Sequence, residues 1–482
     1  MIPLVLAGAV PACSTIWPRP QRCETPAELI GYPVVDIHSH TFNARYLPIE
    51  NIIKARWEST PELHRIDRGL LLDIGQALIA ITPAGYGETR RTATTPLADL
   101  EREARSRAEQ LTPLQAVTRS SVAPDAPAQT VPGAKALSQL PQAGKGPPLT
   151  SQKLVTVVQA MLPQERNVNR KFDPATVRSI ARFVGFLTNG EVQTARELGQ
   201  REFDGRVSLF VHHTMDLGPV FGEQPKGLDF LNFESEQLRR ARQFDQSNDG
   251  RFLHFVAWNP FRRPNDPDPA ADPEPLRLVK EAVRRGAWGV KFYPPSGYRP
   301  SGNDLKVVPR PVQPGAMRDQ WDARYYGLDA GQLDRLNDRL FAWCEAQHVP
   351  IFSHCAYGEF NAAPGYGEKM ADPKYWEPVL KNHPNLYLCL AHAGGADFWF
   401  NSALGHADWG RTVVRLVTQF DHVFCEYGAD DEILDAGQRA TFVSRVAAAI
   451  RDSNGKFAQR IMYGSDWFMP TSAEPRTCFL DG

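Results

Sequence analysis

Residues 34–40 read Val-Val-Asp-Ile-His-Ser-His, a short run of mainly β-branched residues that ends in polar side chains. Such a run predicts a β-strand, here Val34–His38. Similar apolar runs return regularly from residue 206 onward. They predict strands at Val207–His212, Phe252–Trp258, Ala287–Tyr293, Val349–His354, Leu386–His392, Val423–Tyr427 and Arg460–Gly464. Near-continuous apolar strands are typical of parallel sheets that are buried on both faces.

Helical segments separate most of these strands. They are predicted at Leu276–Arg285, Leu333–Gln347, Lys374–Lys381, Trp409–Phe420 and Ala436–Arg451. Eight strands that alternate with helices predict an α/β protein, and specifically a (β/α)8 TIM barrel. An open doubly wound sheet is disfavoured, because the first strand is not followed by the glycine-rich turn of a dinucleotide-binding fold.

A long segment, about residues 64–205, separates the first two strands. It contains a polar helix at Leu97–Gln110, a proline-rich loop at residues 121–150 and an amphipathic helix at Pro174–Leu187. We interpret it as one insertion within a barrel domain of residues 31–482. It begins after the end of the first strand, so we expect it to form a lid or a pocket wall at the barrel mouth. The residues after Asp466 have no helical period, which predicts that the eighth outer helix is missing or is supplied by the early residues.

The composition excludes several classes of protein. Fifty-four basic and 55 acidic side chains give a formal net charge of −1, which disfavours binding to nucleic acid or to anionic membrane surfaces. Hydrophobic residues make up 42% of the chain, enough for a large core, but no run reaches the roughly 18–20 apolar residues of a transmembrane helix. The seven cysteines contain no C-x-x-C pair, which argues against a disulfide framework or a cysteine metal cluster.

The first 30 residues leave the localisation open. Residues 2–13 resemble the end of a signal peptide or a lipoprotein box that finishes at Cys13, but they lack a basic leading region. A misassigned start is the equal alternative. The protein is therefore expected in the cytoplasm, or exported and lipid-anchored if residues 1–30 are a signal remnant. Association into a homo-oligomer is left open.

Chemically active side chains stand where the predicted strands end. These residues are His38, His40, Lys291, His354, His392 and Asp466. In a barrel of this kind the strands end together at the C-terminal face, where reacting groups gather. His38 and His40 are two residues apart on one strand, so both side chains point to the same side.

Three histidines and one carboxylate with an open position for water make a catalytic metal centre, and Zn²⁺ is the first candidate. We predict His38, His40, His354 and Asp466 as the ligands, although each residue alone also has an ordinary structural interpretation. His392 is predicted to polarise a substrate oxygen or to move a proton. Lys291 is predicted to bind substrate; bridging a second metal after carboxylation, forming a Schiff base or pairing with an acid are the alternatives. For His212 and His213 we favour a role in the core or behind the ligands.

The segments DIHSH (36–40), GVKFYPP (289–295), IFSHC (351–355), LAHAGG (390–395) and YGSDW (463–467) resemble the amidohydrolase superfamily. The resemblance is nearest to the amidohydrolase-related branch that includes aminocarboxymuconate-semialdehyde decarboxylase-like proteins. It covers the first strand and nearly everything from about residue 206 to 470. It implies a divalent metal, usually zinc, held by the four predicted ligands, with His392 as the strand 6 histidine. The long insertion and the abrupt C-terminus depart from the family pattern.

These observations predict a metal-dependent hydrolase that acts on a small-molecule amide, ester or lactone. Asp466 would take a proton from water and pass it to the leaving group, while His392 would stabilise the charge that develops on the substrate oxygen. One alternative is non-oxidative decarboxylation at the same centre, because the resembling branch contains both chemistries. The other alternative is a non-catalytic metal-binding barrel.

Overall fold

The computed structural model describes residues 34–41, 207–217, 252–261, 272–304, 330–358, 361, 365–400, 405–428 and 431–467, together with the single positions 69, 72, 194 and 198. The predicted N-terminal segment, the proline-rich loop, the predicted helices at 97–110 and 174–187 and the C-terminal end lie outside the described residues. The insertion therefore stays a prediction. Among the described residues, no helix combines the length and the apolar character that crossing a membrane requires.

Eight parallel strands form one sheet in the order of the sequence. They are β1 (Val34–Ser39), β2 (Val207–His213), β3 (Phe252–Trp258), β4 (Gly289–Phe292), β5 (Ile351–His354), β6 (Leu388–Ala391), β7 (Val423–Tyr427) and β8 (Ile461–Tyr463). The sheet closes through the residues that follow β8: the Asp466 amide donates to the His38 carbonyl at 2.7 Å, and Ser39 pairs with Trp467. The predicted (β/α)8 barrel is confirmed.

The observed strand ends differ slightly from the predicted ones, for local reasons. Strand β5 begins at Ile351 and not at Val349, because Pro350 has no amide hydrogen to donate to a ladder. Strand β6 ends at Ala391, one residue before the predicted end. His392 and Ala393 have φ angles of 59° and 44°, which is left-handed backbone that a strand cannot contain. Strands β3 and β7 have the predicted bounds.

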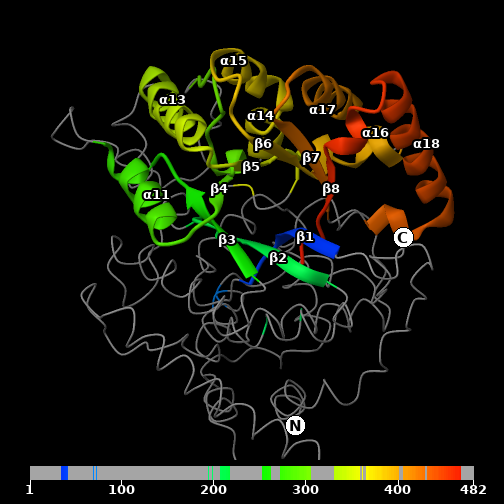
Figure 1. Ribbon diagram of the computed structural model, residues 1–482, viewed down its shortest axis with the longest axis horizontal. Helices are drawn as coiled ribbons and strands as arrows, with labels where there is room; N and C mark the ends of the chain where they lie inside the picture. Colours follow the sequence, from blue (N-terminus) through cyan, green and yellow to red (C-terminus); the bar gives the residue numbers. More distant parts are fainter. Residues whose placement is uncertain are drawn as a thin grey trace, which may run out of the picture.

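Helices lie outside the strands in an arc that Figure 1 shows above β4 to β8. The α-helices are α11 (Glu274–Arg284), α13 (Ala330–Gln347), α14 (Tyr366–Met370), α15 (Trp376–Asn382), α16 (Ala396–Phe400), α17 (Ala407–Gln419) and α18 (Ala436–Asp452). The short 3-10 segments are η5 (Pro294–Ser296), η6 (Pro373–Tyr375), η7 (His392–Gly394), η8 (Asp431–Leu434) and η9 (Phe457–Gln459). The sequence explains the start of α18, because Asp435 caps it by accepting from the Gly437 and Gln438 amides, both at 2.9 Å.

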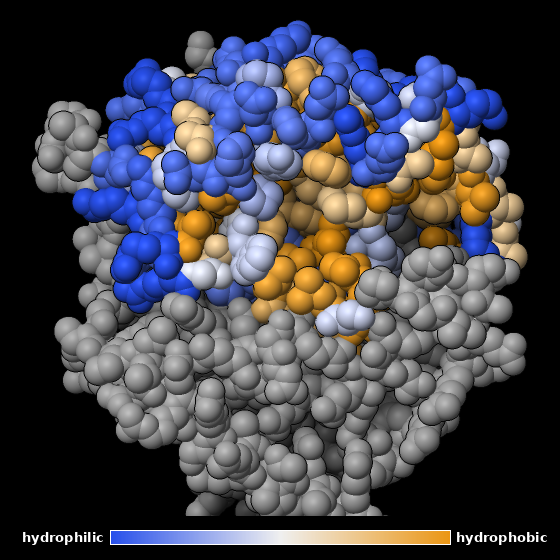
Figure 2. All heavy atoms as spheres, viewed as in Figure 1, coloured by the Kyte–Doolittle hydropathy of each residue, from blue (hydrophilic) through white to orange (hydrophobic). Residues whose placement is uncertain are grey.

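Two apolar layers hold the barrel. The larger fills the space between strands and helices, and α13 contributes Leu333, Leu336, Leu340 and Phe341 at helical spacing. The smaller lies inside the barrel, where Phe352, Cys389 and Ala391 pack with Ile37, Phe255, Phe424 and Met462. On the face seen in Figure 2, hydrophilic residues dominate over the outer helices, and apolar residues appear further in toward the strands.

Candidate metal centre

The predicted site residues come from five strands and meet at the C-terminal end of the barrel. His38 and Lys291 lie on β1 and β4, and His354 is the last residue of β5. His40, His392 and Asp466 follow β1, β6 and β8 directly. All six residues are buried, and the most exposed of them is His40, at 5%. The polar groups therefore share a small, water-poor space, in which electrostatic interactions are strong.

His40 and Asp466 face each other through atoms that both carry lone pairs. The Nδ1 atom of His40 lies 3.0 Å from the carbonyl oxygen of His213, which can only accept, so Nδ1 donates. In the neutral ring, Nε2 then carries a lone pair, and it lies 3.1 Å from Oδ1 of Asp466. Two acceptors at this distance repel unless a proton or a metal ion lies between them.

His38 completes the arrangement. Its Nε2 atom lies 3.3 Å from the same Oδ1 of Asp466. Burial, followed by the nearby positive charge of Lys291, holds the pKa of His38 well below its usual range, so the ring is neutral. Neutral imidazole is the form that binds metals.

The separations of these three ligand atoms fit a divalent ion. Zinc–nitrogen bonds of about 2.0–2.1 Å in a tetrahedral site put neighbouring ligand atoms about 3.3 Å apart. The observed separations from Asp466 Oδ1 are 3.1 and 3.3 Å, and all three ligand atoms lie within 4.8 Å of one another. Two imidazoles and a carboxylate also match the donor types that Zn²⁺ takes in proteins. The residues present therefore fit the ion.

Asp466 is the acid of this group. Burial alone would raise its pKa, but the contact with His40 and the positive charges around it outweigh burial, and the net effect lowers the pKa. Its φ angle of 49° is left-handed, an unusual conformation for a residue other than glycine. Strained backbone of this kind concentrates at functional sites.

His354, the fourth predicted ligand, is not within 4.8 Å of this group of three among the described residues. Its ring centroid lies 4.7 Å from that of His392, whose own ring lies 5.1 Å from His38. Burial lowers the pKa of His354 well below its usual value. Its Nε2 atom has no hydrogen-bond partner among the described residues. The same would be found for a nitrogen that binds a metal ion. Its role as a ligand stays a prediction.

His392 is held by two backbone contacts. Its Nδ1 donates to the carbonyl oxygen of Gly428 at 3.0 Å, and its own amide donates to Oε2 of Glu426 at 3.1 Å. The ring therefore has a fixed orientation. Its Nε2 atom could act in proton transfer, as a base when the ring is neutral and as a donor when it is charged.

Lys291 was predicted to bind substrate, but its side chain is almost fully buried. It is 1% exposed, and its Nζ atom lies 3.0 Å from Nε2 of His38 and 4.6 Å from the centroid of the Phe352 ring. The ammonium group donates into the lone pair that His38 would offer to a metal. Lys291 is thus a neighbour of the proposed centre, and its assignment to substrate stays a prediction.

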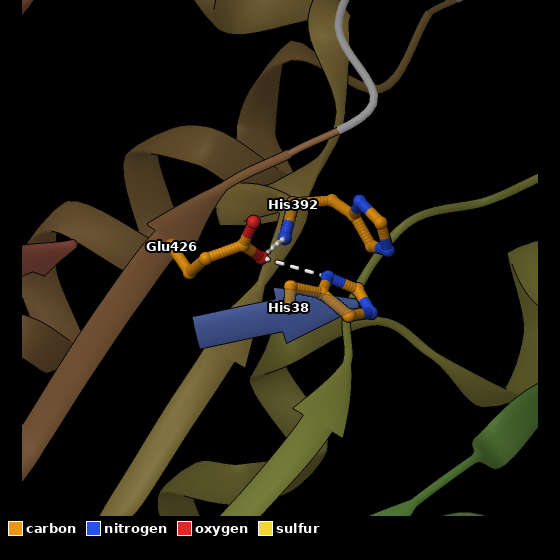
Figure 3. A group of neighbouring side chains, drawn as sticks. All are labelled: His38, His392 and Glu426. Atoms are coloured by element: carbon orange, nitrogen blue, oxygen red, sulfur yellow. Dashed lines mark hydrogen bonds and ion pairs between the residues drawn. The ribbon is translucent and has the colours of Figure 1, made fainter. Parts of the chain in front are cut away.

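Sequence reasoning missed two buried acids that contact the site residues or the backbone next to them. Glu426 on β7 lies 3.3 Å from Nδ1 of His38, as Figure 3 shows. Asp36 on β1 accepts from the Ser465 amide at 2.9 Å and from the Ser465 hydroxyl at 2.5 Å. A signal was present, because an acid inside an otherwise apolar strand is rarely buried unless it is paired.

Beneath these polar groups the barrel is apolar. The ring of Phe352 lies 4.7 Å from that of His38 and 4.2 Å from that of His213, centroid to centroid. His213 is fully buried and donates from Nε2 to the Ile37 carbonyl at 2.8 Å. It therefore lies behind the ligands, in agreement with the sequence interpretation. This apolar floor excludes water below the site and strengthens its charge interactions.

Solved structures similar to this chain include two decarboxylases and an amidohydrolase. The 2,6-dihydroxybenzoate decarboxylase from Rhizobium is 12% identical, over 58% of this chain and 80% of that one, with a TM-score of 0.34. A zinc-bound amidohydrolase from Burkholderia multivorans is 15% identical, over 62% and 81%, also with a TM-score of 0.34. The manganese-bound 5-carboxyvanillate decarboxylase from Novosphingobium aromaticivorans is 11% identical, over 64% and 78%, again with a TM-score of 0.34. No curated protein matches the chain.

The family assignment rests on the sequence itself. The amidohydrolase family model matches residues 238–482, just over half of the chain. This range contains β3 to β8 with the helices that follow them, and it includes Lys291, His354, His392 and Asp466. The chain therefore belongs to the amidohydrolase superfamily and is an enzyme of that superfamily.

Proposed function

We propose that the protein is a metal-dependent hydrolase that acts on a small-molecule amide, ester or lactone. The observation that carries the proposal is the convergence of Nε2 of His38 and Nε2 of His40 on one carboxylate oxygen of Asp466, at 3.3 and 3.1 Å. A divalent ion held there, most suitably Zn²⁺, would lower the pKa of a bound water molecule and would polarise a substrate carbonyl.

The residues of the chain then divide the work. Asp466 keeps a low pKa and touches both histidines, so its carboxylate is ionised and can accept a proton from water. The same carboxyl group can return that proton to the leaving group. His392, with Nδ1 fixed on Gly428, presents Nε2 to the substrate oxygen and in its charged form donates to it. The apolar floor at Phe352 keeps further water away.

Decarboxylation is the competing reaction, and one observation favours it. Lys291 is a buried cation beside the same centre, and a decarboxylation substrate carries the carboxylate that such a cation would attract. Hydrolysis is the better-supported reading, because an ionised acid next to the two histidines provides a base for water, and decarboxylation consumes no attacking water.

Metal analysis followed by product analysis tests the proposal. The purified protein should carry close to one divalent ion per chain. The ion-loaded form should release a new acid group from members of a panel of amides, esters and lactones. Carbon dioxide release from aromatic acids without a new acid group would replace hydrolysis by decarboxylation. Full occupancy by the ion with no turnover on either panel would support a non-catalytic barrel.

Removing the buried cation should tighten metal binding. In Lys291→Met, no ammonium group competes for Nε2 of His38, and no positive charge repels the ion. Two unit charges about 4 Å apart repel by on the order of 4 kcal/mol at an effective dielectric constant near 20. We expect the metal dissociation constant to fall by about tenfold or more, and KM to rise more than kcat falls if Lys291 binds substrate. Chelator competition and steady-state kinetics measure the two effects.

Lys374→Met is the matched control, because it removes a lysine that is 59% exposed and pairs with Asp372 on the surface. It should leave the metal dissociation constant unchanged. Weaker metal binding in Lys291→Met, together with two ions per chain in the wild type, would contradict this expectation. That result would identify Lys291 as a carboxylated bridge.

A further inference from the structure

Glu426 is a fully buried acid that the proposed chemistry does not use. It is the last residue but one of β7, is 0% exposed and points into the barrel between His38 and His392, as Figure 3 shows. Its strand neighbours Phe424 and Cys425 belong to apolar clusters. A buried carboxyl group is costly unless its oxygens are hydrogen-bonded.

One oxygen of Glu426 makes two contacts. Oε2 lies 3.3 Å from Nδ1 of His38 and accepts from the backbone amide of His392 at 3.1 Å. Nε2 of His38 lies 3.0 Å from the Lys291 ammonium, which can only donate, so the neutral ring carries its hydrogen on Nδ1 and donates it to Oε2 of Glu426. Nε2 is the atom that faces Asp466. The contact with Oε2 of Glu426 thus supports the tautomer of His38 that can bind a metal.

The backbone around Glu426 leaves room for its carboxyl group. A Cβ atom added at Gly428 or at Gly464 would overlap Oε1 of Glu426. At Gly464 it would also come within 2.6 Å of Cβ of His38. Any residue other than glycine at these two positions would therefore displace the acid or the histidine. Two strand ends, after β7 and after β8, are built around this one side chain.

We propose that Glu426 is a positioning residue that orients His38 as a ligand and fixes the backbone of His392 at the same time. The inference rests on the proposed metal centre and deepens it. A single carboxylate oxygen then couples the group that holds the ion to the group that moves the proton. Hydrogen-bond partners of ligating histidines raise the basicity of the ring, and their loss typically weakens metal affinity by about 10–100-fold.

Two substitutions at Glu426 test the proposal by metal affinity, which is independent of turnover. Glu426→Gln keeps an oxygen that can accept from Nδ1 of His38 but replaces the carboxyl group by an amide. Glu426→Leu has a similar size and no acceptor. We expect the Zn²⁺ dissociation constant, from chelator competition, to rise about tenfold in the glutamine variant and about 100-fold in the leucine variant. Cys425→Ala, a buried change on the same strand that faces the outer core, should stay within about twofold of the wild type.

Nitrogen-15 labelling of histidine gives a second readout. In the wild type without metal, His38 should give the signals of a ring protonated at Nδ1. The two tautomers should mix when Glu426→Leu is combined with Lys291→Met, because the Lys291 ammonium also donates to Nε2 of His38. If the leucine variant does not fold, the glutamine variant still answers the question through its metal affinity.

The outcomes separate the two hypotheses. A wild-type protein that binds no divalent ion would overturn the proposed function, and the role of Glu426 with it. Wild-type affinity in both Glu426 variants, with a normal metal content, would overturn the positioning role alone. An equal loss in Cys425→Ala would also overturn it, because the effect would then come from general damage to β7.

Discussion

The His40→Ala variant is expected to lose most of its affinity for a divalent metal while the barrel stays folded. His40 lies at the barrel mouth after β1, and its Nε2 is one of the two nitrogens that face Oδ1 of Asp466. Loss of a partner behind a ligand costs about 10–100-fold in affinity, so loss of a direct ligand should cost more than about 100-fold. Elemental analysis of the purified protein and chelator competition measure the loss.

His212→Ala is the matched control for this variant. His212 is a buried histidine on the neighbouring strand, and it contacts the Thr41 hydroxyl at 3.0 Å. Among the described residues, it does not belong to the group of three possible ligands that contains Asp466. Its metal content should equal that of the wild type. Equal zinc, manganese and iron content in His40→Ala and the wild type would remove His40 from the ligand set, and the proposed centre would fail with it.

The Asp466→Asn variant is expected to keep at least part of its metal and to lose turnover by roughly 10²–10⁴-fold. Asparagine has nearly the same shape and one oxygen that can still face the histidines, but its amide cannot accept a proton from water. The measurements are kcat on the best substrate of the panel and metal content of the same preparation. Full activity in this variant would mean that another base activates the water.

His392→Asn provides the companion variant. It should keep the metal almost fully and reduce kcat, because His392 is assigned to the substrate oxygen and not to the ion. The two residues act on one transition state, so the double variant should lose less than the product of the single losses. Loss of the metal in His392→Asn would instead identify His392 as a ligand. Its proximity to His38 gives that outcome a physical basis.

The barrel and most of its strand ends were predictable because apolar runs of this kind must be buried on both faces. The bounds of β3 and β7 follow from such runs directly. The early end of β6 was not predictable from pattern alone, since it depends on the left-handed backbone of His392 and Ala393. Local sequence gave no reason for a histidine to leave the strand there.

The meeting of the candidate residues at one end of the barrel was predictable, and their individual contacts were less so. Strand-end position brought His38, His40 and Asp466 together correctly in space, because parallel strands of a barrel end at one face. Glu426 stood out as an acid in an apolar strand, but it was missed because an apolar strand does not show which of its residues point inward. The contact between Lys291 and His38 joins residues 253 positions apart, and no local pattern encodes it.

The closure of the barrel and the proposed centre occupy the same place. Asp36 and Ser465, which are 429 positions apart, fasten β1 to the residues after β8, and His38, His40 and Asp466 are built into this seam. Contacts of such long range form late in folding, because the entropy of closing the loop must be overcome first. An ion that binds only the closed seam stabilises the closed barrel by mass action, more so as its concentration exceeds the dissociation constant. Metal supply would then control how much of the protein reaches its folded form, and starvation for the ion would lower the amount of enzyme as well as its activity.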